Sequence, residues 1–327
     1  MKNKKQQLIY LAAASHSGST MTAMLLGAHP DLCSVGELKA AHLGNKGSYL
    51  CSCKTLVTEC DFWQGVSTRM TERGQTFSIL DAQTDIRTHA TPYMLKLLKP
   101  LVRSPFMELI RDSLLFLSPT WRKQFPILQK RNADYIAAIA TQSGAEAVVD
   151  SSKIGIRLKY LLKNKELDIK VIWVVRDGRG VSLAYKNPSE YADAKNPKLR
   201  GGGAGKTQEK GRGIEHGAHE WVRCNQETQA VLATMDKDKW MQVHYEDICN
   251  DTEKTLDKIF EFIGVDPTKK RLDFKAVEHH VVGNGMRLDD SDEIKLDDRW
   301  RTELTKEELA QFELVAGNYA HSLGYTE

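Results

Sequence analysis

The chain has 327 residues, of which 41% are hydrophobic, and its 46 basic and 43 acidic residues give a formal net charge of +3. Such a chain is long and apolar enough to bury a core, and its near-balance of charge argues against a protein that coats nucleic acid. The apolar run at residues 8–14 is far shorter than the ~18 residues of a membrane span. We therefore expect a folded, cytoplasmic protein with no membrane and no nucleic-acid partner, with a secretory signal as the alternative interpretation of the basic start.

Four short runs of apolar or β-branched residues lie between turns and are typical of buried parallel strands. These runs are residues 8–14, 145–150, 169–175 and 240–245. Because helical patterns alternate with them, the sequence predicts an α/β fold with right-handed crossovers. Ligands of such sheets bind at the carboxyl ends of the strands.

Apolar residues at helical spacing indicate the connecting elements. These segments are residues 20–28, 156–164, 215–235 and 252–263. Gly264 would cap the last of them at its carboxyl end. Thr305 and Glu308 form a capping-box pattern, which predicts a further helix that reaches Ser322.

Two segments interrupt this alternation within the single domain that we expect for residues 1–327. Residues 62–143 have helical character with proline breaks, which indicates a helical insertion that covers one edge of the sheet and forms part of a pocket. Residues 187–213 are rich in Gly and Lys and poor in apolar residues, which indicates a mobile loop or lid. A solvated linker explains that composition equally well.

The first strand leads through a turn of small residues into the first helix. In this turn Ser17, Gly18, Ser19 and Thr20 would present backbone N–H groups and hydroxyls to an anion at the positive end of the helix. The P-loop signature has a lysine directly before its Ser or Thr, whereas Ser19 stands there in this chain. A nucleoside triphosphatase is therefore disfavoured, and a simple Ser/Thr cap would also explain the turn.

A second turn of this kind follows the run at residues 169–175. Arg176 stands directly after that run, and arginine suits bidentate recognition of phosphate. A structural salt bridge explains this arginine equally well. Together, however, two anion-type turns on one sheet favour a nucleotide with phosphates at separate positions.

Three of the six cysteines lie close together in the pattern Cys51-x-Cys53-x6-Cys60. The pattern lacks the C-x2-C spacing of a zinc knuckle. We therefore expect reduced structural thiols, with a local disulfide or a metal clip as the alternative.

The two anion-type turns and the segments around them resemble the sulfotransferases that use 3′-phosphoadenosine 5′-phosphosulfate (PAPS). "SHSGSTMTAMLLGAHP" is similar to the family's 5′-phosphosulfate loop, and "VIWVVRDGRGVSLAY" is similar to its 3′-phosphate motif. "VVDSSKIGIRLKYLL", "VHYEDICNDTEKTLDKIFEFIGV" and "GNGMRL" resemble three further elements in the family's order. The likeness covers residues 8–60 and 145–325 and implies a P-loop-like three-layer sandwich, in which helices flank a central parallel sheet. "AHPDLCSVGELKAA" is closest to tyrosylprotein-type and bacterial stand-alone members.

The resemblance implies roles for three catalytic residues. Glu37 would be the base that takes the proton of the acceptor hydroxyl or amine, and Lys153 would stabilise charge on the leaving group. His16 stands where many members have Lys or Arg, so it would act either as a neutral donor or as an imidazolium that supports the leaving phosphate. Each also has a structural explanation: a solvated carboxylate at a helix start, a surface lysine, and a histidine that packs over the turn.

The resemblance also implies a set of cofactor-binding residues. These are Ser17, Gly18, Ser19, Thr20, Arg176, Ser182, Tyr245, Asn284 and Arg287. The family often has a serine eight residues after the arginine, where this chain has Ala184, so either Ser182 substitutes for it or the contact is absent. Tyr245 would meet the adenine or belong to the core. Arg287 would close over the 3′-phosphate or lie on the surface of its Gly-rich turn.

The sequence thus predicts an enzyme that moves the sulfonate group of PAPS to a hydroxyl or amine of a small soluble metabolite and releases 3′,5′-ADP. This chemistry requires no metal. The alternatives are a nucleotide or small-molecule kinase with a degenerate P-loop, and a non-catalytic nucleotide-binding protein. If copies of the chain associate, a symmetric homodimer is the commonest arrangement.

Overall fold

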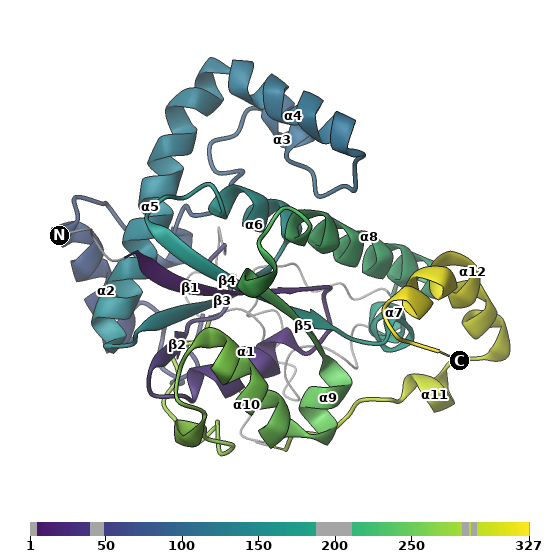
Figure 1. The fold of residues 1–327 in the computed structure, drawn as a ribbon. Helices are drawn as coiled ribbons and strands as arrows, with labels where there is room; N and C mark the ends of the chain where they lie inside the picture. The colour runs from purple at the N-terminus through teal and green to yellow at the C-terminus, as the bar shows by residue number, and fades with distance from the viewer. Residues whose placement is uncertain (1–4, 40–48, 188–210, 283–287, 289–292, 327) are drawn as a thin grey trace.

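A five-stranded parallel sheet forms the centre of the computed structural model, which describes residues 5–39, 49–187, 211–282, 288 and 293–326. The strands are β1 (Gln6–Ala13), β2 (Leu32–Ser34), β3 (Ala147–Lys153), β4 (Leu167–Val175) and β5 (Trp240–His244). Their order in the sheet is β2-β3-β1-β4-β5, and all neighbours pair in parallel (Figure 1). The four predicted strands and the α/β fold are therefore confirmed.

Helices cover both faces of this sheet, as Figure 1 shows. On one face lie α2 (Asp61–Glu72), α5 (Pro119–Ser143), α6 (Gly155–Leu161), α7 (Gly178–Lys186), α8 (Ile214–Leu232) and α12 (Lys306–Ser322). On the other lie α1 (Ser19–Gly27), α9 (Tyr245–Asn250) and α10 (Thr252–Ile263). The three-layer arrangement is confirmed.

Strand β1 shows why two layers of helices are needed. Its side chains alternate between the two faces, so that Leu8 and Tyr10 pack into one apolar cluster and Ile9 and Leu11 into the other. All four are fully buried. A strand buried on both faces reads as a continuous apolar run, as residues 8–14 do.

The predicted helix ends are also present. Gly264 ends α10 with a φ of +93°, a left-handed conformation that glycine adopts without a steric penalty. Thr305 accepts a hydrogen bond from the N–H of Glu308, whose carboxylate accepts one from the N–H of Thr305, which completes the capping box of α12. The remaining short elements are α11 (Trp300–Glu303) and the 3-10 turns η1 (Ile79–Asp81), η3 (Lys237–Lys239) and η4 (Pro267–Lys269).

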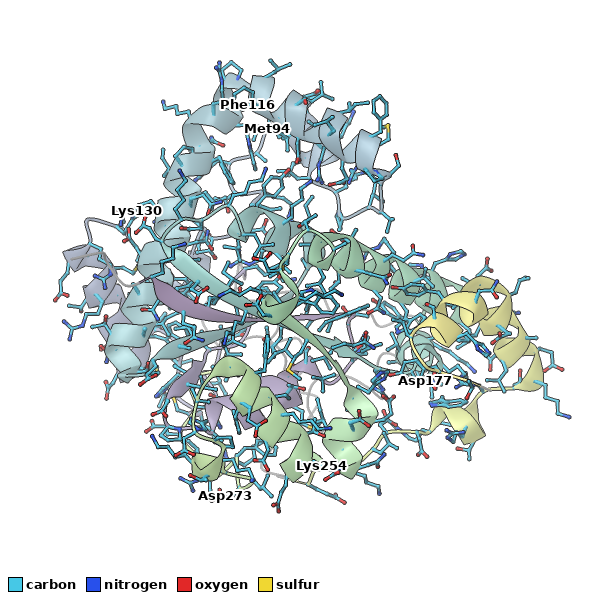
Figure 2. All side chains as sticks on the ribbon, in the orientation of Figure 1. Met94, Phe116, Lys130, Asp177, Lys254 and Asp273 are labelled. Atoms are coloured by element: carbon cyan, nitrogen blue, oxygen red, sulfur yellow. The ribbon has the colours of Figure 1, made fainter. Side chains whose placement is uncertain are left out.

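The segment between α2 and the end of α5 has two parts. Helix α2 packs on α5 within the main core, whereas α3 (Pro92–Leu97), α4 (Pro105–Leu117) and the start of α5 stand away from the sheet (Figure 1). Figure 2 labels Met94 and Phe116 in this outer part, where the Phe116 side chain is exposed. The outer part has a small apolar cluster of its own, which includes Met94, Leu115 and Trp121 together with Ile156 and Tyr160 of α6.

The prolines of this segment start helices more often than they break them. Pro92, Pro105 and Pro119 lie in the first turns of α3, α4 and α5, where the backbone N–H that proline lacks has no partner within the helix. The helices are interrupted before Pro105 and Pro119, as the predicted proline breaks require, whereas Pro126 lies inside α5 without ending it. Only part of the predicted loop at residues 187–213 can be assessed, because residues 188–210 lie outside the described residues.

None of the helices in the described ranges combines the length and the apolar content that crossing a membrane requires.

Candidate active site

The turn between β1 and α1 lies at the carboxyl edge of the sheet. His16 and Gly18 both have left-handed backbones, with φ values of 63° and 76°. A Cβ at Gly18 would lie 2.3 Å from the ring of Tyr245, so only glycine fits against this tyrosine. Within the described part of the chain, the buried hydroxyl of Ser17 has no hydrogen-bond partner. An unpaired buried hydroxyl beside a helix start suits an anion such as a phosphate.

Arg176, the first residue after β4, reaches this turn from the neighbouring strand. Its guanidinium donates to the carbonyl of His16 at 2.8 Å and to the carbonyl of Asp297 at 2.6 Å, and it forms an ion pair with the Asp297 carboxylate at 3.0 Å. The same guanidinium lies 4.7 Å from the centre of the Tyr245 ring. The two predicted anion turns therefore meet, and the salt bridge weighed for Arg176 is present.

The residues that follow Arg176 hold its backbone in place. Asp177 caps α7 by accepting from the N–H of Arg179 at 2.9 Å, and its own N–H donates to the Glu246 carboxylate at 2.9 Å. The indole of Trp221 in α8 donates to the carbonyl of Arg176 at 2.9 Å. Figure 2 labels Asp177 on the side of the molecule where α7, α11 and α12 lie. Sequence reasoning missed these supports, because they join elements far apart in the chain.

A second charged group lies at the carboxyl ends of β2 and β3. Lys153, the last residue of β3, places its Nζ 2.9 Å from Glu37 Oε1, and the Nζ of Lys39 lies 3.5 Å from Glu37 Oε2. Burial opposes ionisation of Glu37, but the two lysines outweigh it and lower the pKa of this carboxyl. Glu37 is therefore ionised at neutral pH. Both side chains are largely buried, so Glu37 is not a solvated carboxylate and Lys153 is not a surface lysine.

A buried ion pair lies next to the backbone that carries Glu37. Asp150 and Arg157 are fully buried and lie 3.2 Å apart. The Asp150 carboxylate also accepts from the N–H of Leu38 at 3.2 Å, and the hydroxyl of Ser152 accepts from the N–H of Lys39 at 3.0 Å. The "VVDSSK" run thus fixes the backbone directly after Glu37. The aspartate at a strand end was the sequence signal for this support, but its partners could not be predicted.

His16 lies between these two groups of charges. Burial, Lys153 and Arg176 together lower the pKa of His16 to about 4, so that its ring is neutral at neutral pH. The ring packs edge-on against Tyr185, with centroids 5.2 Å apart. Of the two forms left open by the sequence, this structure favours the neutral imidazole over the imidazolium.

A cavity of about 180 Å³ opens beside Glu37 and Lys153. Ser15 of the first turn and Tyr185 of α7 line it, and Pro100 from the outer helical segment forms part of its wall. The expectation that this segment contributes to a pocket is therefore confirmed. The rest of the lining is Ala13, Lys39, Ile154, Gly155, Glu220, Arg223, Cys224 and Glu227.

The other predicted cofactor residues are placed as follows. Ser19 and Thr20 start α1 beside Gly18. Ser182 is buried against α8, where a Cβ at Gly217 would lie 2.6 Å from its Cα, and within the described ranges its hydroxyl has no hydrogen-bond partner. Tyr245 lies against Gly18 and Arg176, where the two anion turns meet. Asn284 and Arg287 lie outside the described residues.

Comparisons with known proteins agree with this arrangement. A sequence profile described as "Sulfotransferase family" matches residues 158–269. The structure aligns with the sulfotransferase domain from the curacin biosynthetic pathway over 99% of each chain, with a TM-score of 0.52 and 15% identity. The chain has the sulfotransferase fold. A sulfotransferase domain from the Synechococcus PCC 7002 olefin synthase aligns over 99% of this chain and 98% of that chain, with 16% identity and a TM-score of 0.47.

The sulfotransferase resemblance that the sequence motifs indicated is therefore confirmed. Mouse carbohydrate sulfotransferase 2 is 27% identical over 201 residues, which are 51% of this chain. This chain spans only 37% of the length of that mouse protein. The profile match includes Arg176, Ser182 and Tyr245 but neither the β1 turn nor Glu37 and Lys153. The roles of those residues in a sulfotransferase site stay predictions.

Proposed function

We propose that this chain is a PAPS-dependent sulfotransferase that acts on a polar hydroxyl- or amine-bearing acceptor. The observation that carries the proposal is the Glu37–Lys153 pair, which opens onto a cavity that Ser15, two residues before the first anion turn, also lines. A base and a cation at one end of an acceptor cavity are what transfer of a sulfonate group requires.

The anion turns would bind the two ends of the nucleotide. The turn from Ser17 to Thr20 would hold the 5′-phosphosulfate, which would give the unpaired Ser17 hydroxyl a partner. Arg176 would bind the 3′-phosphate in exchange for the Asp297 carboxylate, and Tyr245 would lie close to the adenosine. The cofactor roles of Ser182, Asn284 and Arg287 remain predictions.

The transfer step would use Glu37 as the base and Lys153 as the cation. The acceptor oxygen or nitrogen forms a bond to sulfur and gives its proton to Glu37, while the bond from sulfur to the bridging phosphate oxygen breaks. The electron pair of that bond stays on 3′,5′-ADP, and Lys153 stabilises the new charge. Because protonation neutralises Glu37, it also releases Lys153 from its 2.9 Å ion pair at the moment when the leaving group needs a cation.

The cavity favours a small and polar acceptor. Lys39 and Arg223 supply positive charge to its wall, and Glu220 and Glu227 supply negative charge. Such a lining can hydrogen-bond hydroxyls and amines of a compact metabolite. The name of the mouse relative makes a sugar hydroxyl the first acceptor class to screen. The cytoplasmic location and the homodimer remain predictions.

Thermal stability with 3′,5′-ADP, 5′-AMP and Mg-ATP in parallel tests the nucleotide site, because a ligand of the native state raises the apparent Tm. We expect a shift with 3′,5′-ADP that is lost in Arg176→Ala. A shift with Mg-ATP alone would indicate a kinase instead. Sulfonate transfer from PAPS to a panel of sugars and amines then tests catalysis, and binding of 3′,5′-ADP without any turnover would indicate a non-catalytic nucleotide-binding protein.

A further inference from the structure

Four potential metal ligands converge at a site that the proposed reaction does not use. The Sγ atoms of Cys51, Cys53 and Cys60 and a ring nitrogen of His280 all lie within 4.8 Å of one another. His280 Nδ1 is 3.3 Å from the sulfur of Cys60 and 3.8 Å from that of Cys51. The sulfurs of Cys53 and Cys60 are 3.6 Å apart. Thiolate and imidazole are the ligands that zinc prefers in structural sites.

Three of the six separations match the edges of a tetrahedron around zinc, and the other three are at most 4.8 Å. With Zn–S bonds of about 2.3 Å and Zn–N bonds of about 2.05 Å, tetrahedral geometry requires S···S distances of about 3.8 Å and S···N distances of about 3.6 Å. The three observed separations agree with these values to within ~0.3 Å. A disulfide would need sulfurs about 2.05 Å apart and would use only two of the four groups.

The local fold brings two of the cysteines together in a tight turn. Leu50 and Leu56 form an antiparallel bridge, and the N–H of Cys51 donates to the carbonyl of Thr55 at 2.9 Å. Lys54 closes the turn with a left-handed backbone, at a φ of 69°. The third cysteine, Cys60, is the N-cap residue of α2, so the start of this helix fixes its position beside the turn.

Ser52 joins this turn to the segment that carries the histidine. Its N–H donates to the carbonyl of Val281 at 3.3 Å, its hydroxyl accepts from the N–H of Val281 at 2.8 Å, and the same hydroxyl donates to the carbonyl of His279. These bonds hold His280 next to the sulfurs, although it is 229 residues from Cys51 in the sequence.

The His280 ring is also oriented for metal binding. Nδ1 faces the sulfurs, while Nε2 lies 3.6 Å from the carboxylate of Glu278. A carboxylate on the far side of the ring favours a proton on Nε2 and so leaves the Nδ1 lone pair for a metal. The ring of Phe62 stacks on the imidazole, with centroids 4.4 Å apart and planes inclined by 5°.

We propose that Cys51, Cys53, Cys60 and His280 bind a structural Zn²⁺ ion. On binding, the three thiols release their protons and become thiolates, and no oxidation or reduction takes place. Because the protein supplies all four ligands, no coordination position is open for a substrate, and the ion has no direct part in chemistry. The metal clip that the sequence left as an alternative is thus completed by a histidine from the other end of the chain.

The site also braces the candidate base, a consequence that rests on the proposed function. Val282, two residues after His280, donates to the carbonyl of Val35 at 3.0 Å and accepts from the N–H of Glu37 at 3.4 Å. A Cβ at Gly36 would lie 1.8 Å from the carbonyl oxygen of Val282, so the two segments are in close contact. Zinc would therefore fix the backbone of Glu37 through one short run of residues.

Metal analysis of the purified full chain tests the site without any measurement of turnover. We expect roughly one zinc per chain by mass spectrometry, and substitution by Co²⁺ should give the absorption of a tetrahedral thiolate complex. Cys60→Ser, His280→Ala and Cys53→Ser should each lose most of the metal. Cys53→Ser should disturb the fold least of the three, because Cys53 is only partly buried. Cys33→Ser, a cysteine in β2 outside the cluster, should keep it.

Three results would overturn the proposal. One is a wild-type chain that stays metal-free after incubation with Zn²⁺, and another is zinc content unchanged in Cys60→Ser and His280→Ala. The third is a Cys53–Cys60 disulfide in the freshly purified chain. Failure of the proposed reaction is distinguishable from all three, because a chain that binds zinc but transfers no sulfonate would contradict the proposed function alone.

Discussion

The carboxyl edge of the sheet and the cysteine cluster both bring distant residues together, but they do so by different means. At the edge, Lys153 and Arg176 are the last residue of one strand and the first after another, so the parallel ladder sets their positions. In the cluster, turns and a helix start place the four ligands, and the contacts of Ser52 align them. Backbone pairing thus places Lys153 and Arg176 without an ion, whereas the cluster needs an ion to complete it.

The largest effect should come from the base at the sheet edge. Glu37→Gln keeps the size of the side chain but removes the proton acceptor, so we expect kcat to fall by about 10²- to 10⁴-fold. Binding of 3′,5′-ADP should remain, since Glu37 does not touch the anion turns. Single-turnover transfer from PAPS measures the effect, with Glu261→Gln on the exposed face of α10 as the matched control. Full activity in Glu37→Gln would remove this residue from the mechanism.

The second effect tests the arginine of the same edge. Arg176→Ala should weaken the binding of 3′,5′-ADP by about 10- to 100-fold, because a hydrogen bond to a charged group contributes about 1.5–3 kcal/mol. Asp297→Asn is the informative partner variant. It removes the carboxylate that competes for Arg176, so the affinity should stay the same or rise. Calorimetric titration decides, and equal weakening in both variants would make the ion pair structural.

The third effect tests whether the cysteine cluster supports the edge. Chelation of the full chain, or Cys53→Ser, should lower the Tm by about 3 °C or more, which corresponds to ~2 kcal/mol for a chain of this size. If zinc positions Glu37, kcat should fall while the KM for PAPS stays constant, and added Zn²⁺ should restore the chelated chain but not the variant. A fall in Tm with an unchanged kcat would limit the ion to stability.

The smallest effect concerns pH. The pKa of His16 is about 4 in the folded chain against 6.5 for a free histidine, so the unfolded chain takes up the proton first as the pH falls. His16 therefore contributes stability above pH 6.5 that is lost between pH 6.5 and about 4. Replacement by Gln should flatten the fall of Tm across that window in calorimetric scans. An unchanged slope would show that other groups cause the acid dependence.

The activity should respond to acid in a different window. The pKa of Glu37 is lowered below 4.5 by its lysines, so the base should stay ionised, and kcat/KM should stay level, until the pH falls below 4.5. A pH–rate profile that declines already near pH 6 would place the titration on another group.

Much of the sheet edge could be predicted from the sequence, because strands and their turns are local patterns. The run at residues 8–14, the small-residue turn after it and the arginine after residues 169–175 are each contiguous, and parallel pairing then brings the strand ends together. Glu37 came only from the resemblance. No local pattern indicates that Asp297 pairs with Arg176, because neither residue has a periodicity that points to the other.

The cysteine cluster could be predicted only in part for the same physical reason. Cys51, Cys53 and Cys60 are close in sequence, but the fourth ligand arrives across 229 residues through loop contacts. The spacing alone therefore favoured thiols without a metal. The carboxylate of Glu278 and the ring of Phe62 likewise had no sequence signal.

The outer helical segment has its own small apolar cluster, separate from the two clusters that pack on the sheet. Substitutions within α3 and α4 should therefore cost the sheet little, although Pro100 beside them lines the acceptor cavity. Because this cluster includes Ile156 and Tyr160 of α6, a redesign of this part must keep those two contacts for the end of β3 to keep its geometry. For an engineer, it is the place to alter which acceptor is chosen without rebuilding the chemistry.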